Sequence, residues 1–215
     1  MTKLTCHNVR ASAHTSLLFP MLALMVLCSA CAPKLEQRGD MDIKTSVYVQ
    51  PEHPLPLLSK KLLIAPVDMS SPRAREWIPT VTTIVQDIFS QERVFKVIVR
   101  GNKKFDSPET LLENARQQGF DYVLFGSVPP VIFPSGNTSG WIGFDMKIVS
   151  TTNHVTIWHI YGQAALVPAP TKWSILGDAS YAPAPSLSQG FTAILHHMAC
   201  IIKCQAIGPP CSHTP

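Results

Sequence analysis

The feature that most limits what this chain can fold into is a short apolar run close to its start. Residues 17–27 read LLFPMLALMVL, and the segment before them holds Lys3 and Arg10 but no acidic residue. A helix that spans a bilayer takes about 20 apolar residues, whereas this run has eleven. A basic start followed by such a run is typical of a secretory signal peptide, which is removed from the mature protein. We therefore predict a signal peptide over residues 1–30 and a fold built from the residues after it.

The residues that follow the run resemble the lipobox of bacterial lipoproteins. They read Leu-Cys-Ser-Ala-Cys over positions 27–31, with Cys28 where the motif usually has leucine. The resemblance implies that the Cys31 thiol is diacylated with palmitate-class chains and that the leader is cut just before it. The new amine is then acylated, and three acyl chains, at about 0.8 kcal/mol per buried methylene, make a permanent anchor. A plain secretory signal cleaved near Cys31 and an uncleaved anchor remain as alternatives.

The residue after Cys31 favours one of the two bacterial membranes. In Gram-negative lipoproteins an aspartate at this position is the usual signal for retention at the inner membrane, and this chain has Ala32. We therefore expect a protein anchored by lipid to the outer membrane, on its periplasmic side.

The charge balance argues against a nucleic-acid partner. The chain has 18 Lys and Arg residues against 14 Asp and Glu, and two of the basic residues belong to the leader, which leaves 18 − 2 = 16. These charges are scattered along the sequence, whereas a nucleic-acid-binding protein usually has a basic stripe. The partners we expect are the membrane and other envelope proteins.

The mature chain is predicted to begin with a lipidated, proline-rich tether over residues 31–60. Pro33, Pro51, Pro54 and Pro56 fall in it. Within the tether, residues 43–49 read IKTSVYV, with Ile43, Val47 and Val49 on one side of an extended chain. This piece is either an extra edge strand, on its own sheet or on a neighbour's, or a short solvated segment with β propensity.

A compact domain is predicted over residues 61–203. Residues 61–67 form a continuous apolar run, which is typical of a strand covered on both faces. Apolar residues at i, i+3, i+4, i+7 and i+8 indicate an amphipathic helix from Pro79 to about Glu92, and residues 94–99 read as a second strand. Ser107 and Pro108 have the residue types of a helix start, and a third strand follows over residues 121–127.

The second half of the domain has a different pattern. Residues 128–140 are rich in proline and glycine and are predicted to form a loop. Residues 141–150 alternate apolar and polar side chains, as a half-exposed strand does, and residues 154–166 form its hairpin partner. A second loop over 167–185 and a helix over 187–203 complete the domain, and a tail with cysteine and proline covers 204–215. The predicted fold class is a single α/β (α+β) domain in the order β-α-β-α-β-β-β-α, with helices packed on a mixed sheet.

This order of elements and several short motifs resemble a group of envelope proteins. The group comprises the curli-secretion lipoprotein CsgG, the TolB amino-terminal domain and the Pel polysaccharide-export lipoprotein PelC. The matching residues are Ala-Pro-Val at 65–67, the strand VFKVIV at 94–99, ARQQGFDYVLFGSV at 115–128 and Ile157-Trp158. The resemblance implies an envelope lipoprotein that assembles, secretes or scaffolds, often as a ring.

The cysteines near the carboxyl terminus form the most notable set of reactive side chains. His196, Cys200 and Cys204 are spaced i, i+4 and i+8, on the side of the last helix away from its apolar stripe. Thiols in the oxidising periplasm are expected to pair, and a Cys204–Cys211 disulfide would close a short loop. Cys200 would then remain for a partner or another copy, although other pairings stay open. A Cys/His metal site is an alternative, but the spacing matches no common zinc pattern, so we predict no metal.

The sequence holds no recognisable catalytic motif. His196 and His197 lie near Ser188, but there is no Gly-x-Ser-x-Gly elbow and no evident acidic residue to orient a histidine. We therefore predict a protein that is not an enzyme and that has no cofactor. Trp141, Trp173 and Tyr181 are either core residues or, since exposed aromatic side chains anchor interfaces, partner-docking residues.

These observations favour a non-enzymatic component of envelope assembly or export, either secretion or polysaccharide export, working as a homo-oligomer with other envelope proteins. Two alternatives remain. One is a lipoprotein regulator of a peptidoglycan synthase, for which a long disordered tether is the usual mark. The other is a periplasmic thiol or metal protein that uses the tail cysteines.

Replacing Cys31 by alanine tests the predicted anchor. Because only a thiol at this position can form the thioether, Cys31→Ala should abolish incorporation of labelled palmitate and leave the uncut precursor, visible by intact mass. The matched control, Cys28→Ala, should still incorporate the label. Undiminished labelling of the Cys31→Ala protein would contradict the prediction.

Overall fold

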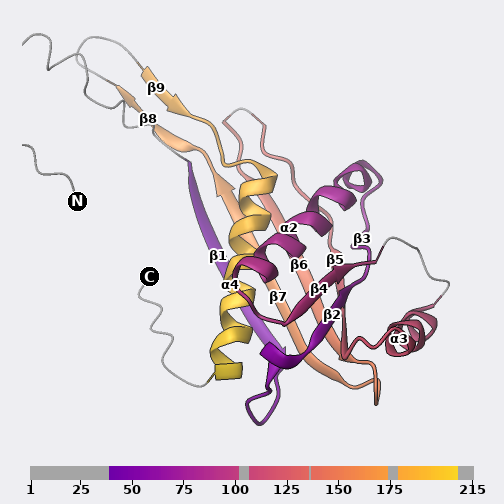
Figure 1. The fold of residues 1–215 in the computed structure, drawn as a ribbon. Helices are drawn as coiled ribbons and strands as arrows, with labels where there is room; N and C mark the ends of the chain where they lie inside the picture. Colours follow the sequence, from indigo (N-terminus) through magenta and orange to yellow (C-terminus); the bar gives the residue numbers. More distant parts are fainter. Residues whose placement is uncertain (1–38, 102–106, 136, 174–178, 208–215) are drawn as a thin grey trace, which may run out of the picture. The chain divides into compact units, whose positions relative to one another are not determined.

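The computed structural model describes residues 39–101, 107–135, 137–173 and 179–207. Their central feature is a seven-stranded mixed sheet in the order β1-β7-β6-β5-β2-β4, with the short β3 also paired to β5 (Figure 1). The predicted signal peptide, the lipidation site Cys31 and the tail residue Cys211 lie outside the described residues. The predicted fold class, a mixed sheet with helices packed on it, is confirmed.

One half of the sheet is parallel, and its inner strand β2 has both faces covered, whereas the edge strand β4 is largely exposed. This half consists of β2 (Lys61–Ile64), β3 (Asp68–Met69), β4 (Val97–Arg100) and β5 (Tyr122–Val128). In β2, Leu62 and Ile64 belong to one hydrophobic cluster and Leu63 to a second one, which includes Ala65. The apolar run at 61–67 is therefore covered on both faces, as predicted. The strand itself ends before Pro66, because proline has no N–H for the ladder.

The other half is antiparallel and contains the predicted hairpin. Strands β6 (Gly140–Ser150) and β7 (Thr156–Val167) pair along almost their whole length. The alternating apolar residues of β6 point to one face, where Ile142, Phe144, Met146 and Ile148 are fully buried. Strand β7 adds Trp158 and Ile160 to the same core. Period-two patterning was thus sufficient to predict both strands.

The predicted tether needs a correction, because part of it belongs to the folded body. Residues Asp40–Val49 form β1, which pairs antiparallel with β7 at the edge of the sheet. Met41 and Ile43 pack against the core, and the Thr45 hydroxyl is hydrogen-bonded to His197 Nδ1 at 2.7 Å. The 3-10 helix η1 (Leu57–Ser59) then buries Leu57. The compact body therefore begins about twenty residues before the predicted boundary at Lys61, and the edge-strand alternative is the correct one.

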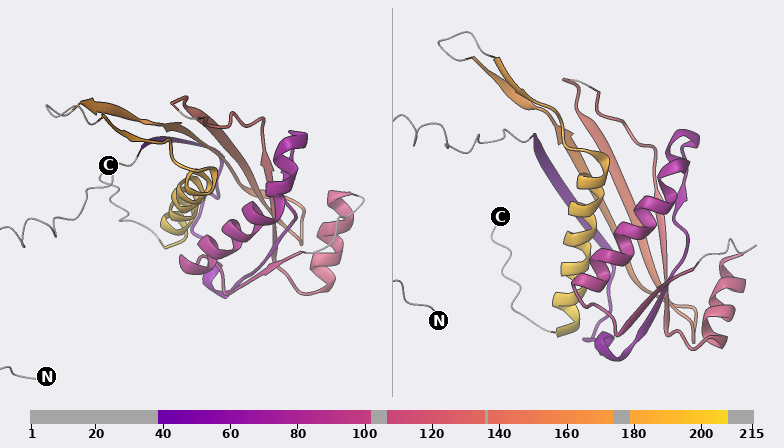
Figure 2. Two further views of the ribbon diagram at one scale, coloured as in Figure 1. Left: turned by 90° about the horizontal axis from the view of Figure 1, so that it is seen from above. Right: turned by 45° about the horizontal axis from the view of Figure 1, so that its top comes forward.

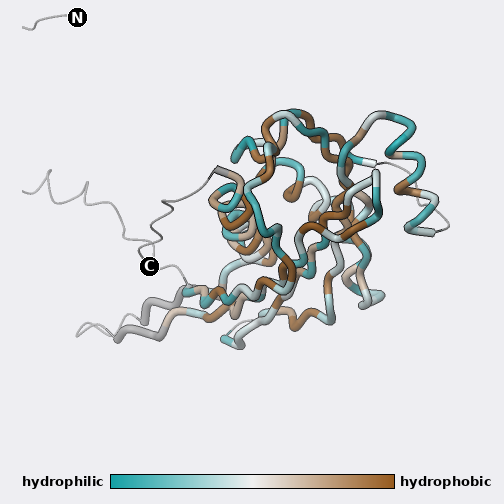
Figure 3. The backbone as a smooth tube through the Cα atoms, turned by 90° about the horizontal axis from the view of Figure 1, so that it is seen from below, coloured by the Kyte–Doolittle hydropathy of each residue, from teal (hydrophilic) through white to brown (hydrophobic). Residues whose placement is uncertain are grey.

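Helices cover the two faces of the sheet unequally (Figure 2). After the 3-10 helix η2 (Pro72–Trp77), α2 (Ile78–Gln91) packs beside α4 (Leu187–Ile207) on one face. The short α3 (Pro108–Gln117) packs on the other face, against the second cluster. Its start is as predicted, since the Thr110 N–H donates to Ser107 Oγ at 3.2 Å. Figure 3 shows α3 as a largely hydrophilic helix, and its buried residues are Leu111, Leu112 and Ala115, which belong to the second cluster.

A second correction concerns residues 167–185, which were predicted to be a loop. Residues Ala169–Trp173 form β8 and Ala179–Ala182 form β9, and the two pair as a separate antiparallel ribbon that continues from β7. Proline is tolerated at the edge of a ribbon, where no ladder hydrogen bond is required of its nitrogen. The prolines at 168 and 170 are therefore compatible with a strand, although in the sequence they favour a loop.

Helix α4 approaches the sheet closely at two glycines. A Cβ at Gly162 of β7 would lie 2.6 Å from Ile194 Cγ2, and one at Gly190 of α4 would lie 2.5 Å from Ile142 Cδ1. Real Cβ atoms are not found at such distances, so both positions have no room for a larger side chain. The two glycines set how deeply α4 sits against β6 and β7.

Introducing valine at Gly162 should test this close approach. Overpacking a filled core typically costs about 1–3 kcal/mol, so Gly162→Val should lower the free energy of unfolding by about that amount in a denaturant titration. Gln163→Val, one residue along on the opposite face, is the matched control and should change it by less than about 0.5 kcal/mol. Equal stability of the Gly162→Val and unaltered proteins would show that the helix is not tightly seated.

Candidate functional site

The sheet has one face that the helices leave largely open. Helix α3 covers this face at Leu63 and Val123, in β2 and β5. The α3 cluster also includes Val149 at the end of β6, but over the rest of β6 and over β7 and β1 no helix among the described residues packs on this face. We call this area the open face; its side chains come from Trp141, Asp145, His159, Tyr161 and Gln163, with Tyr48 at the sheet edge.

The centre of the open face is a group of polar and aromatic side chains. His159 Nε2 lies 2.7 Å from Asp145 Oδ1, and the rings of Tyr48 and His159 are 5.0 Å apart between centroids. Burial, with the nearby Tyr48 and Asp145, raises the pKa of Tyr161 above its usual value. These groups offer hydrogen bonds and ring faces to a protein surface, since Tyr and His have an apolar body with a polar tip.

The structure places the predicted docking residues at one end of the sheet. Trp141 is half-buried and lies along the open face, with its ring 3.3 Å from the position of a Cβ at Gly143. Trp173 lies in β8 and Tyr181 in β9, so the ribbon brings their backbones together. The side chains of residues 170–182 lie outside the described part of the structure. A docking role for the three residues stays a prediction.

This same end of the sheet carries exposed apolar side chains, which we call the apolar end. Ile132 is 60% exposed and Phe133 39%, and the loop that holds them is fixed because Ile132 and Trp141 exchange two backbone hydrogen bonds of 2.9 Å. Val167, at the end of β7, is also exposed and lies opposite Asp40, the first residue of β1. The chain that comes from Cys31 thus enters the body at the apolar end.

No helix in the described part of the chain is both long enough and apolar enough to cross a bilayer.

A second group of functional side chains lies on the other face, where α2 ends beside α4. Glu92 directly follows α2, and its carboxylate contacts two side chains of α4. Oε1 lies 3.0 Å from His196 Nε2, and Oε2 lies 3.0 Å from Lys203 Nζ. Cys200 Sγ lies 3.7 Å from His196 Nδ1. We call Glu92, His196 and Cys200 the Glu92 cluster. Sequence reasoning missed Glu92 because it is 104 positions before His196 and no spacing pattern links the two.

The structure separates the cysteines of α4 into two kinds. Both are partly exposed, as predicted from their position on the helix. Cys200 is a free thiol, and its pKa is raised by burial and by the negative charge of Glu92. Cys204 is disulfide-bonded. Because Cys211 lies outside the described residues, the predicted pairing of Cys204 with Cys211 stays a prediction.

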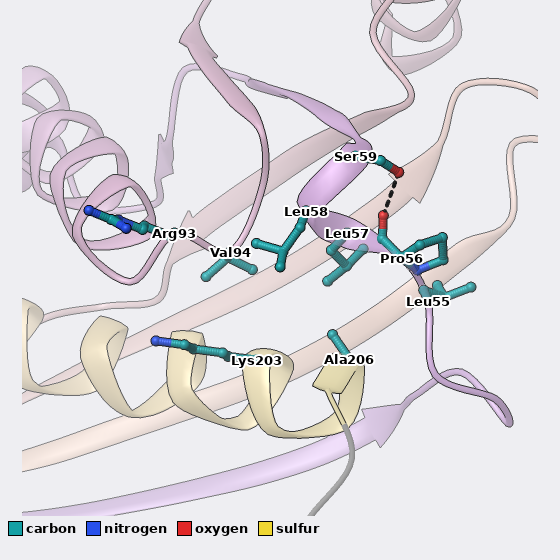
Figure 4. Close-up of a pocket in the computed structure, with 9 residues that line it drawn as sticks. All are labelled: Leu55, Pro56, Leu57, Leu58, Ser59, Arg93, Val94, Lys203 and Ala206. Atoms are coloured by element: carbon teal, nitrogen blue, oxygen red, sulfur yellow. Dashed lines mark hydrogen bonds between the residues drawn. The ribbon is translucent and has the colours of Figure 1, made fainter.

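A cavity of about 350 Å³ opens beside the Glu92 cluster, between η1 and the end of α4 (Figure 4). Its walls are mostly apolar, with Leu57 and Leu58 facing Ala206. The cations Arg93 and Lys203 stand at its margin and extend away from the leucines. Lys203 is already paired with Glu92, so the cavity and the Glu92 cluster share this residue.

Comparison with known proteins identifies the fold but no family. No family model matches the sequence, and no curated protein matches it. Among solved structures, the chain is similar to the PelC dodecamer from Paraburkholderia phytofirmans, with 15% identity and a TM-score of 0.52 over 78% of this chain and 99% of that one. The body therefore has the fold of PelC, as the predicted resemblance implied. The resemblance to CsgG and TolB stays a prediction.

Two further structures are more distantly similar. The hypothetical protein CT253 from Chlamydia trachomatis is 8% identical with a TM-score of 0.47, over 69% of this chain and 98% of that one. The lipoprotein GNA1162 from Neisseria meningitidis is 15% identical with a TM-score of 0.33, over 50% of this chain and 81% of that one.

Proposed function

We propose that this chain is an envelope lipoprotein, anchored by Cys31 to the periplasmic side of the outer membrane, that acts as a non-enzymatic part of an export or assembly complex. The observation that carries the proposal is the fold shared with PelC over most of the folded body. The leader and the lipobox-like residues 27–31 support the anchor. The proposed role is to position partners by protein contacts rather than to transform a substrate.

The position of the apolar end supports this anchorage. Gly39 follows Cys31 by eight positions, so the link between lipid and body reaches at most about 28 Å when fully extended. Gly39 itself passes close to the body, since a Cβ there would lie 2.6 Å from the Val167 carbonyl oxygen. A link this short keeps the apolar end, with Ile132 and Phe133, near the membrane surface.

The contacts of the α4 histidines support a role without catalysis. His197 Nδ1 is hydrogen-bonded to the Thr45 hydroxyl, and His196 is bound to Glu92. A general base for hydrolysis would have to lie within hydrogen-bond reach of its nucleophile. Neither of these two contacts involves Ser188, the serine that precedes the histidines on α4.

The edge strand β1 supports self-association. A long edge strand exposes unpaired backbone groups that other chains can bind, and proteins normally cover or charge such edges. Strand β1 has ten residues, and its last three, Val47, Tyr48 and Val49, are all exposed. A neighbouring copy packed against this end of β1 would cover them. The PelC structure is a dodecamer, and we propose that this chain forms a homo-oligomer too.

The alternative role, regulation of a peptidoglycan synthase, is less favoured. A regulator that must reach a synthase across the periplasm needs a long tether. Because β1 begins at Asp40, the segment free to act as a tether is shorter than the sequence predicted.

Cross-linking in cells, followed by native mass spectrometry of the detergent-extracted protein, tests the proposal. We expect one discrete oligomer that contains several copies of this chain. Tyr48→Lys should shift it to smaller species by adding charge at the exposed end of β1, whereas Val155→Lys, at another exposed apolar position in the β6–β7 turn, should not. A monomer bound to a synthase would contradict the proposal.

A further inference from the structure

We propose that the Glu92 cluster is a binding site for a divalent transition metal of the zinc class, built from one carboxylate oxygen, one imidazole nitrogen and one thiolate. This inference concerns the end of α2 and the outer side of α4. It does not depend on the export role or on the lipid anchor.

The backbone already brings the three donors together. His196 and Cys200 are four residues apart on α4, so their side chains lie on the same side of the helix, one turn apart. Glu92 reaches them from the residue that caps α2. One donor atom from each residue can be chosen so that all three lie within 4.8 Å of one another. Two contacts exist already on opposite nitrogens of the imidazole, 3.0 Å from Glu92 Oε1 to His196 Nε2 and 3.7 Å from Cys200 Sγ to His196 Nδ1. Only one of these nitrogens can bind the ion, so one of the two contacts has to rearrange.

These distances suit a tetrahedral ion with little rearrangement. Zinc binds histidine nitrogen and carboxylate oxygen at about 2.0–2.2 Å and cysteine sulfur at about 2.3 Å. In a tetrahedron of such bonds the donor atoms are roughly 3.3–3.8 Å apart. Rotation of the half-exposed side chains can bring the three donors to this separation without movement of the helices. Three protein ligands leave the fourth position for water or for a donor from a partner.

The donor chemistry separates zinc from the hard cations. Calcium and magnesium take oxygen ligands, whereas this cluster has one oxygen beside a nitrogen and a sulfur. Thiolate and imidazole together suit zinc and related ions.

Lys203 orients the carboxylate for this role. Its ammonium group binds Glu92 Oε2, while His196 is bound to Oε1. The lysine thus holds one oxygen of Glu92 and turns the other toward the histidine. A hydrogen-bonded partner of this kind fixes the geometry of a metal ligand.

Titration of the full-length detergent-extracted protein with Zn²⁺, followed by calorimetry, tests the site. We expect one ion per chain, and loss of at least tenfold in affinity for Cys200→Ser and for His196→Ala. His154→Asn is the matched control, because this exposed histidine has a φ of 58° that asparagine also adopts. It should bind as the unaltered protein does.

Co²⁺ supplies a readout that identifies the sulfur ligand. The Co²⁺-loaded protein should show a sulfur-to-metal charge-transfer absorption that is absent in Cys200→Ser, with unchanged circular dichroism to show that the variant is folded. Absence of Zn²⁺ binding, or Zn²⁺ binding that Cys200→Ser leaves unchanged, would overturn the proposal.

Discussion

The packing of α4 against strands β6 and β7 is the interaction on which the rest of this structure depends. Its apolar residues are buried in the core that the helix shares with the sheet and with α2: Phe191, Ile194, Leu195, Met198, Ala199 and Ile202. Each large side chain of this kind contributes about 1.5–3 kcal/mol when it is withdrawn from water. The contact is possible because Gly162 and Gly190 leave room for the side chains opposite them. With α4 fixed in this way, α2 packs beside it, and β1 packs on the edge of the same core through Met41 and Ile43.

This packing also explains how the two faces of α4 come to serve different purposes. The inner face is entirely used by the core, so polar and reactive residues are confined to the outer face. There His197 binds Thr45 of β1 and Lys203 binds Glu92 at the end of α2. The helix therefore connects the edge strand, the second helix and the proposed metal site. The apolar end, from which the chain leads back to Cys31, is formed instead by the loop of Ile132 and Phe133 and by the adjoining ends of β1, β6 and β7.

Sequence reasoning predicted the elements whose patterns are periodic and local. The stripe of α2, the cap at Ser107 and the alternation in β6 each follow from a few neighbouring residues, and the structure has them where they were expected. Sequence reasoning left open whether residues 43–49 form an edge strand or a solvated segment. In this exposed, proline-rich stretch, only Met41 and Ile43 indicate that the strand packs on a core. The β8–β9 ribbon was missed for a related reason, since its prolines are typical of a loop. The Glu92 cluster depends on tertiary packing alone, which no spacing along the chain reveals.

We propose that a lipid anchor at Cys31 holds this body with its apolar end toward the membrane. The most direct test of this arrangement is a photo-reactive amino acid placed at Ile132, at the apolar end, or at Val155, at the opposite end of β6 and β7, in the lipidated protein in outer-membrane vesicles. If the apolar end faces the membrane, position 132 should cross-link to lipid and position 155 should not. Equal lipid labelling at both positions, or labelling at 155 alone, would contradict this arrangement.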